Sequence, residues 1–429
     1  MGSGGTMADL ESYRARGGRW DPPVGPETTR IEPLAPAGPV VWELAPSKSH
    51  MQRWLLLAAQ GEKQVTLRFS GTPGEDIESM ARCLCQLGVR IERGEGAWVV
   101  HGVGAHGWAR PASVLNCANS GTALRLLTVA AARLDCPVML DGDATLRARH
   151  SQALVDLVRA LGVEVSHGFG EEVLPYLLRG PPSAADVTVD VSDSSQPLSA
   201  LLLSMPAMQG PLDVKLGGEA VSRRHARLSF DLAAQTGSSN TLTWGNGLLL
   251  EPWEVDCPEE VHIPGDRSLE AFANLYAALH GVELEVPNRP DDADALGAEV
   301  LKQLTTAAHG PDQVDLRDAN DLLPPLAALL ALGDGGTITG AAHARHKESN
   351  RIERTVELLA AFGIEASATE DGIKVDGNQS PEAPEEMVRT HADHRLWMTA
   401  ACLATQVRGE PDPPWIHAVS APAFMSRFA

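Results

Sequence analysis

One arrangement of apolar and polar positions recurs along the chain. An apolar stretch with helical spacing ends at a glycine, and two short segments of alternating apolar and polar residues follow it. Residues 80–102 and 154–180 show this clearly, 230–252 more weakly, and 356–377 again. Helical spacing predicts a helix, glycine caps it in a left-handed conformation, and period-two alternation predicts strands. Each stretch is therefore expected to fold as a helix followed by two strands.

The glycines that end the first three predicted helices are evenly spaced. Gly88, Gly162 and Gly237 lie 74 and then 75 residues apart. Even spacing predicts a few large α+β modules in tandem, although any α/β protein can form such corners by chance. The polar, acidic stretch 253–265 is interpreted as a crossover between domains. Residues 1–30, which are rich in glycine and polar residues, are expected to form a flexible arm or an expression tag.

Composition narrows the class of protein. A chain of 429 residues favours two or three domains. No apolar run reaches the roughly 18 residues of a membrane span, and the six cysteines form no CxxC pair, so we expect reduced thiols and a cytoplasmic protein. The net charge of −21 argues against nucleic-acid binding. It leaves room for a local basic site that binds a small anion.

The first candidate site is the stretch Ala45-Pro-Ser-Lys-Ser-His50, which opens an apolar helix. The backbone N–H groups of a first helical turn attract anions. Lys48 and Ser49 lie beside that turn, and Arg53 follows one turn later. The alternative is a serine cap followed by two solvated basic residues.

Two further motifs place polar residues before apolar helices. In Asn119-Ser-Gly-Thr-Ala-Leu-Arg125, Gly121 permits close backbone approach and Thr122 offers a hydroxyl group. In Asp193-Ser-Ser-Gln196, two hydroxyls and an amide suit a ligand that carries hydroxyl or phosphate groups. Each motif alone is also typical of an ordinary helix cap.

The densest run of charge is His343-Ala-Arg-His-Lys-Glu-Ser-Asn-Arg351. We expect Lys347 and Arg351 to share one face of a helix, with the carboxyl group of Glu348 among the cations. Such a cluster suits an oxyanion ligand and proton transfer. The alternative is a charged, solvated helix start.

The last motif is Asp393-His-Arg395, before another apolar helix. Asp393 is expected to cap that helix, whereas Arg395 has no structural role there and is the better ligand candidate. Asp321 also precedes an apolar helix, where the helix dipole favours an acidic residue.

Together these motifs resemble the EPSP synthase (3-phosphoshikimate 1-carboxyvinyltransferase) family across residues 40–428. The resemblance implies an α/β fold of two similar lobes, each made of three βαβαββ units (an inside-out α/β barrel), with the active site in the cleft between the lobes. Residues 46–260 would form the N-terminal lobe, and residues 31–45 with 261–429 the C-terminal lobe. The motifs that carry the resemblance are SKSH with Arg53, NSGTALR, RAR ending at Arg149, SSQ, DLLPPLAAL, RHKESNR and DHR.

The resemblance also implies which residues bind which substrate. Those expected to bind shikimate 3-phosphate are Lys48, Ser49, Arg53, Ser194, Ser195, Gln196, Ser222, Asp321 and Lys347. Those expected to bind phosphoenolpyruvate are Lys48, Asn119, Gly121, Thr122, Arg149, Gln196, Arg351 and Arg395.

The implied reaction transfers a carboxyvinyl group, with Glu348, Asp321 and Lys48 as the catalytic residues. It requires no metal or other cofactor, and we expect a monomer that binds neither nucleic acid nor membranes. Two alternatives stay open: an enzyme of the same fold that acts on another hydroxyl acceptor, and a catalytically silent paralogue that only binds ligands.

Some positions depart from the family pattern. His225 replaces a tyrosine, Leu126 replaces a proline, and Trp397 stands where the family prefers a small residue. In the C-terminal stretch, Pro422 stands where the family has a lysine. Arg427 either supplies the missing charge to phosphoenolpyruvate or is an ordinary solvated residue.

Overall fold

A computed structural model describes residues 29–149, 152–168, 174–245, 247–290, 297, 299–302, 312–412 and 415–428. The first 28 residues of the predicted arm lie outside this range. The chain divides into two compact units. Unit 2 is the continuous segment Pro46–Pro264, and unit 1 combines the described residues up to Ala45 with those from Gly265 onward.

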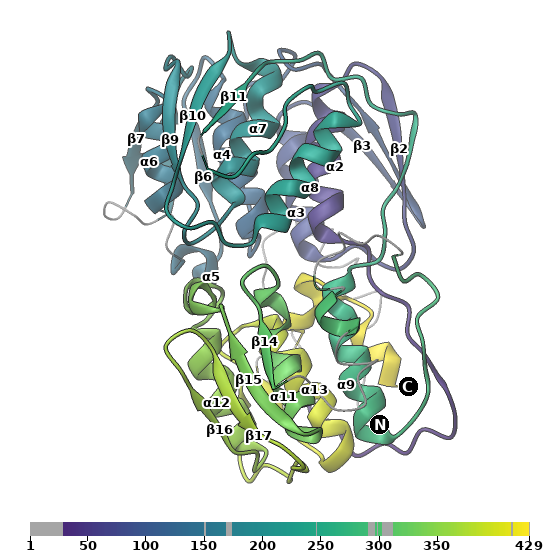
Figure 1. Cartoon of the computed structure of the whole chain (residues 1–429). Coiled ribbons are helices and arrows are strands. Elements are labelled where there is room, and N and C mark those ends of the chain that lie inside the picture. Colours follow the sequence, from purple (N-terminus) through teal and green to yellow (C-terminus); the bar gives the residue numbers. More distant parts are fainter. Residues whose placement is uncertain are drawn as a thin grey trace. The chain divides into compact units, whose positions relative to one another are not determined.

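The sheets of unit 2 share one strand pattern (Figure 1). An outer strand lies parallel to the second strand, the third is antiparallel to the second, and where a fourth strand is present it is antiparallel to the third. The strands, in sheet order, are β12 (Glu260–His262), β2 (Gln64–Arg68), β4 (Ala97–His101) and β3 (Arg90–Gly94); β5 (Leu115–Asn116), β6 (Val138–Asp141), β8 (Tyr176–Arg179) and β7 (Glu164–His167); and β9 (Asp186–Asp190), β10 (Leu212–Gly217) and β11 (Leu248–Leu250).

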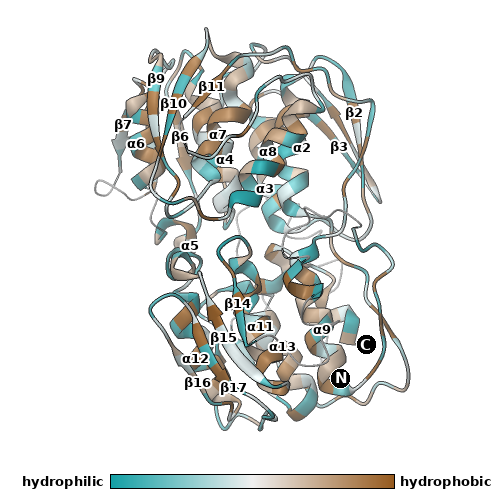
Figure 2. Cartoon of the chain, viewed as in Figure 1, coloured by the Kyte–Doolittle hydropathy of each residue, from teal (hydrophilic) through white to brown (hydrophobic). Residues whose placement is uncertain are grey.

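Helices connect these strands and pack together in the middle of the unit. Helix α7 packs on α4 and α8, and Figure 2 shows that α7 is mostly hydrophobic. Buried side chains of the helices and of the three sheets form one hydrophobic core that lies wholly within unit 2. The helices are α2 (Lys48–Gln60), α3 (Glu75–Gln86), α4 (Gly121–Ala132), α5 (Ala144–Arg147), α6 (Gln152–Ala160), α7 (Gln196–Ser204) and α8 (Arg223–Ala234).

Unit 1 repeats the same four-stranded pattern once and has a separate core. Its short pairs β1–β13 and β18–β19 are parallel. The strands are β14 (Gln313–Asp315), β15 (Gly335–Thr339), β17 (Ile373–Asp376), β16 (Ala366–Ala368), β1 (Val40–Val41), β13 (Leu284–Glu285), β18 (Val388–Arg389) and β19 (Pro411–Asp412). The helices are α9 (Glu270–His280), α11 (Leu323–Leu332), α12 (Arg351–Ala361) and α13 (His394–Val407), with 3₁₀ turns η2 (Arg267–Leu269), η3 (Asn320–Leu322), η4 (Ala342–His346), η5 (Ile416–Val419) and η6 (Phe424–Phe428).

Three of the four predicted corners have the expected helix and both strands. They are α3 with β3 and β4, α6 with β7 and β8, and α12 with β16 and β17. The glycines between helix and strand, Gly88, Gly162 and Gly363, have φ of 94°, 85° and 71°, the left-handed region that glycine adopts without strain.

The prediction for residues 230–252 is wrong in one strand. Helix α8 and strand β11 form, but the described residues 238–243 contain no strand. There the side chain of Asn240 donates to the Glu251 carbonyl at 2.9 Å and accepts from the Glu251 N–H at 2.7 Å. The Asn240 side chain thus forms the hydrogen bonds with the Glu251 backbone that a neighbouring strand would otherwise form.

Candidate functional site

Hydrogen bonds join several helices of unit 2 near their N-terminal ends. On α2, the amide of Gln52 donates to the backbone oxygen of Asp76 in α3 at 2.8 Å and to the hydroxyl of Ser120, the cap of α4, at 3.0 Å. On α7, the amide of Gln196 donates to the Thr122 hydroxyl at 2.9 Å. Helix N-termini carry partial positive charge and free N–H groups, so their convergence favours an anion.

Lys48 begins helix α2, as the first motif predicts. The Ser47 side chain caps this helix by accepting from the His50 N–H. The ammonium group of Lys48 lies 3.1 Å from Asp76 Oδ2, and the two side chains are 14% and 7% exposed. Asp76 therefore fixes the position of the lysine, a role that the sequence analysis missed.

Gly121 lies where two arginines approach the backbone. A Cβ atom at this position would lie 2.6 Å from Arg125 Nη1 and 3.1 Å from Arg149 Nη1, so a larger residue would displace a guanidinium group. Arg149 also donates to the side-chain oxygen of Asn119 at 2.8 Å. The structure thus brings Asn119, Gly121 and Arg149 together.

Of the two serines in the third motif, Ser194 bonds through its side chain to the start of helix α7, whereas Ser195 does not. Ser195 precedes α7 without a side-chain capping bond, and its buried hydroxyl instead donates to the Ser222 carbonyl at 2.6 Å. Ser194 accepts from the Gln196 N–H at 3.2 Å. Ser222 has φ of 51°, a left-handed conformation that is uncommon outside glycine. These contacts place Ser194, Ser195, Gln196 and Ser222 in one group.

Arg53 is fully buried and bonded within the protein, so it is not the solvated residue of the alternative interpretation. Its guanidinium group donates to the Ser49 carbonyl at 2.9 Å, the Ser229 hydroxyl at 2.7 Å and the His225 carbonyl at 3.1 Å. Burial lowers the pKa of Arg53 to about 10.

In unit 1, the guanidinium group of Arg351 contacts three carboxylates. It lies 2.7 Å from Asp321 and 2.8 Å from Asp393, and it also pairs with Glu348. Its side chain is 1% exposed. Burial opposes the charge of Arg351, but the carboxylates of Asp393, Glu348 and Asp321 outweigh it and raise the pKa of the guanidinium group. The three carboxylates therefore stabilise the charged form of Arg351.

Arg395 completes this cluster from the start of α13. Asp393 caps the helix, as predicted, by accepting from the Arg395 N–H at 2.9 Å. The guanidinium group of Arg395 donates to Asp321 Oδ2 at 2.8 Å and to the Ser268 hydroxyl at 3.0 Å. Asp321 thus bridges Arg351 and Arg395, and the sequence analysis missed the role of Ser268.

The predicted helix through Lys347 and Arg351 is wrong. Residues 342–346 form the 3₁₀ turn η4, Lys347 follows it with the non-helical angles φ −91° and ψ −147°, and α12 begins only at Arg351. The two cations therefore do not share a helix face. The segment 343–350 contains few apolar side chains, so burial cannot hold it as a helix.

Trp397 and Pro422, two positions that depart from the family pattern, both lie near His417. The indole of Trp397 on α13 stacks on the His417 ring, with ring centroids 4.7 Å apart. Burial lowers the pKa of His417 to about 3, and a hydrogen bond with the Pro422 backbone opposes that shift in part. Arg427 lies 3.6 Å from Glu43 Oε2, so the structure gives it a partner other than a ligand.

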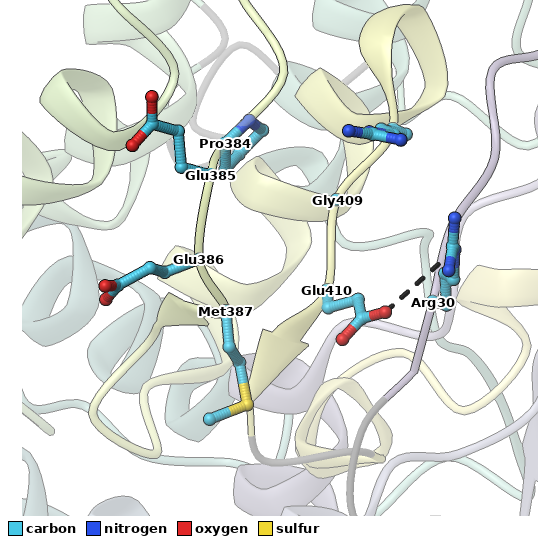
Figure 3. Close-up of a pocket in the computed structure, with 8 residues that line it drawn as sticks. Arg30, Pro384, Glu385, Glu386, Met387, Gly409 and Glu410 are labelled. Atoms are coloured by element: carbon cyan, nitrogen blue, oxygen red, sulfur yellow. Dashed lines mark ion pairs between the residues drawn. The ribbon is translucent and has the colours of Figure 1, made fainter.

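Two cavities of unit 1 lie apart from these motifs. Figure 3 shows one of about 230 Å³, where Arg30 and Glu410 approach within 3.9 Å. Among the described residues, no three His, Cys, Asp or Glu side chains gather where they could hold a metal ion, and no helix is long and apolar enough to span a membrane.

The fold and these contacts define an α/β protein of two units, each with cations held at helix N-termini. The sequence model of EPSP synthase (3-phosphoshikimate 1-carboxyvinyltransferase) matches residues 37–421. A curated relative of that name from Methanocorpusculum labreanum is 33% identical over 89% of this chain and 93% of its own. Another relative of that name, from Halobacterium salinarum, is 31% identical over 85% of this chain and 89% of its own. The solved EPSP synthase of Acinetobacter baumannii superposes with a TM-score of 0.73 at 24% identity. The superposition covers 93% of this chain and 96% of that structure's chain.

The chain therefore belongs to the EPSP synthase family.

Proposed function

We propose that this protein transfers the carboxyvinyl group of phosphoenolpyruvate to the 5-hydroxyl group of shikimate 3-phosphate and releases phosphate. Family membership supports the reaction. The observation that carries it is the meeting of Arg351 and Arg395 on Asp321, at 2.7 and 2.8 Å. Two buried guanidinium groups at helix starts suit the carboxylate and phosphate of phosphoenolpyruvate.

The carboxylates in this cluster would change partners when substrate binds. Anionic groups of phosphoenolpyruvate would take over N–H groups of Arg351 and Arg395 that Asp321 now accepts. Asp321 would then be free to accept the proton of the attacking hydroxyl. Glu348 would deliver a proton to the methylene carbon of phosphoenolpyruvate, and the hydroxyl oxygen would bond to the neighbouring carbon. The Glu348 carboxylate would then take a proton back from the new methyl group as phosphate leaves, which restores the double bond.

The polar residues of unit 2 would bind the remaining anionic groups of the two substrates. We assign Lys48, Asn119, Gly121, Thr122, Arg149 and Gln196 to phosphoenolpyruvate. Lys48 also belongs to the shikimate 3-phosphate set, because its ammonium group can contact two anions. The other residues assigned to shikimate 3-phosphate are Ser49, Arg53, Ser194, Ser195, Gln196, Ser222, Asp321 and Lys347.

The test is the release of phosphate from phosphoenolpyruvate in the presence of shikimate 3-phosphate. We expect product only with both substrates. Phosphate release with a different hydroxyl acceptor, and none with shikimate 3-phosphate, would favour the alternative acceptor. Binding of both substrates without any turnover would favour the silent paralogue.

The cytoplasmic location and the monomeric state stay predictions. Light scattering on the eluting protein would give 45.6 kDa for a monomer, and a mass twice as large would contradict it.

A further inference from the structure

The guanidinium group of Arg395 has two side-chain partners, which differ in exposure. Its Nη2 atom donates to Asp321 Oδ2 at 2.8 Å and to the hydroxyl group of Ser268 at 3.0 Å. The Asp321 side chain is 29% exposed, whereas Ser268 is 4% exposed and Arg395 is fully buried. A substrate can therefore displace Asp321 from Arg395 more easily than it can displace Ser268.

The Ser268 hydroxyl group is itself oriented by Asp266. It donates to Asp266 Oδ1 at 2.6 Å, and the same oxygen accepts from the Ser268 N–H at 3.1 Å. The backbone of Asp266 is fixed in turn by a bond from its N–H to the Ala45 carbonyl at 2.8 Å. A hydroxyl group has a single proton, so Ser268 can only accept from Arg395. Donation to a carboxylate also makes the hydroxyl oxygen a stronger acceptor.

The Ser268 bond becomes more important when Asp321 changes partners, as the proposed reaction requires. Arg351 then keeps the buried carboxylate of Asp393 at 2.8 Å. Arg395 has no second carboxylate: in the part of the chain that the structure describes, the other acceptors of its guanidinium group are Ser268 and the Asp321 carbonyl, at 3.3 Å. Without the Ser268 hydroxyl group, Arg395 would lose the side-chain contact that fixes its orientation.

We propose that Ser268, oriented by Asp266, is a positioning residue that holds Arg395 in place for an anionic group of phosphoenolpyruvate. This inference rests on the proposed function. The alternative is that Ser268 serves only the turn η2, which Asp266 caps. In that case, loss of the hydroxyl group would lower stability without a selective effect on phosphoenolpyruvate.

The test is steady-state phosphate release by Ser268→Ala. We expect KM for phosphoenolpyruvate to rise about tenfold, because the charged guanidinium group loses a hydrogen bond that positions it. The kcat should change little, because Arg395 holds the anion in the ground state and in the transition state alike. KM for shikimate 3-phosphate should stay at its wild-type value, which also shows that the variant is folded.

Two further variants isolate the effect. Thr405→Val removes a buried hydroxyl group from α13 that bonds the Cys402 carbonyl, and this matched control should leave both KM values unchanged. Asp266→Asn keeps Ser268 but removes the carboxylate that polarises it, and should raise KM for phosphoenolpyruvate by about two- to fivefold. Added to Ser268→Ala, it should raise KM no further, because both residues act through one contact.

The measurements separate a wrong role for Ser268 from a wrong function. If the wild type turns over, an unchanged KM for phosphoenolpyruvate in Ser268→Ala, an equal rise of both KM values, or independent effects of the two substitutions would each overturn the inference. If the wild type binds both substrates without turnover, the proposed reaction fails, and the calorimetric Kd for phosphoenolpyruvate with shikimate 3-phosphate present replaces KM in the same comparison. A wild type that does not bind phosphoenolpyruvate would overturn both.

Discussion

At the scale of single residues, Glu348 has the most specific expected role. It is the carboxylate among the cations of the fourth motif, and it pairs with Arg351 while its side chain keeps 11% exposure. Arg351 has two other carboxylate partners, so the structure does not need Glu348 to neutralise it. A proton-transfer role explains why a carboxylate occupies this position.

We therefore expect Glu348→Gln to lower kcat by about 10²–10⁴-fold, the range of general acid–base groups. The amide keeps the shape and the acceptor oxygen, so KM for both substrates should change little. Steady-state phosphate release gives both constants. Glu353→Gln, five residues further along the chain and 48% exposed, is the control and should retain activity. A fall of less than tenfold in Glu348→Gln would refute the role.

Pro422 is the second residue with a direct test. If the lysine of the family contacts phosphoenolpyruvate there, its loss removes a charge-assisted hydrogen bond. Pro422→Lys should then lower KM for phosphoenolpyruvate by about tenfold. Arg427→Ala should leave KM unchanged, because Arg427 is paired with Glu43. If Arg427→Ala raised KM tenfold, the charge would instead have moved to Arg427.

The candidate residues could be found from the sequence only where a motif surrounds them. Lys48, Gly121 and Arg351 each lie in a dense polar run before an apolar helix. Asp76 and Ser268 do not: Asp76 reaches Lys48 from 28 positions away, and Ser268 reaches Arg395 from 127. Contacts of that kind depend on how helices pack, which local pattern does not encode.

At the scale of elements, the predictions held where burial and backbone preference agree. The corner at Gly88 combines an apolar helix, a left-handed glycine and two alternating strands. The corner at Gly237 has the glycine, with φ of 95°, but polar residues follow it and Asn240 replaces the expected strand pairing. The run 343–350 lacks the apolar periodicity that would bury a helix face.

The element η5 should make the protein sensitive to mild acid. His417 is buried with its pKa lowered to about 3, whereas an unfolded histidine has a pKa of about 6.5. The unfolded chain therefore gains a proton first as the pH falls, and stability present above pH 6.5 is lost below it. The free energy of unfolding should therefore fall by about 2 kcal/mol between pH 7 and pH 5 because of His417.

We expect His417→Gln to be less stable at pH 7 but to lose about 2 kcal/mol less than the wild type on acidification to pH 5. Urea unfolding at both pH values measures the difference. His262→Gln, at a histidine whose side chain is 79% exposed, is the control and should keep the wild-type pH dependence. An identical pH dependence in His417→Gln and wild type would show that His417 is not the group responsible.

At the scale of the whole molecule, each unit has its own hydrophobic core. Unit 2 is one continuous segment whose two ends meet. Strand β12, near the end of the segment, pairs with β2, near its start, with Val261 opposite Leu67. The Ser47 N–H also donates to the Pro264 carbonyl at 2.8 Å. The segment 46–264 therefore contains the contacts that close its first sheet.

We expect a fragment of residues 46–264 to fold by itself and to unfold cooperatively in urea, because burial of its own core drives folding. A fragment of residues 46–252 is the matched comparison. It lacks β12, so β2 loses its parallel neighbour, and the buried side chains of Val255, Cys257, Val261 and Ile263 are missing from the core. Removing the three aliphatic side chains alone costs about 4.5–9 kcal/mol, so the shorter fragment should unfold at a lower urea concentration. A gradual transition in the longer fragment, or equal midpoints for both, would show that unit 2 does not fold independently or that β12 does not stabilise it.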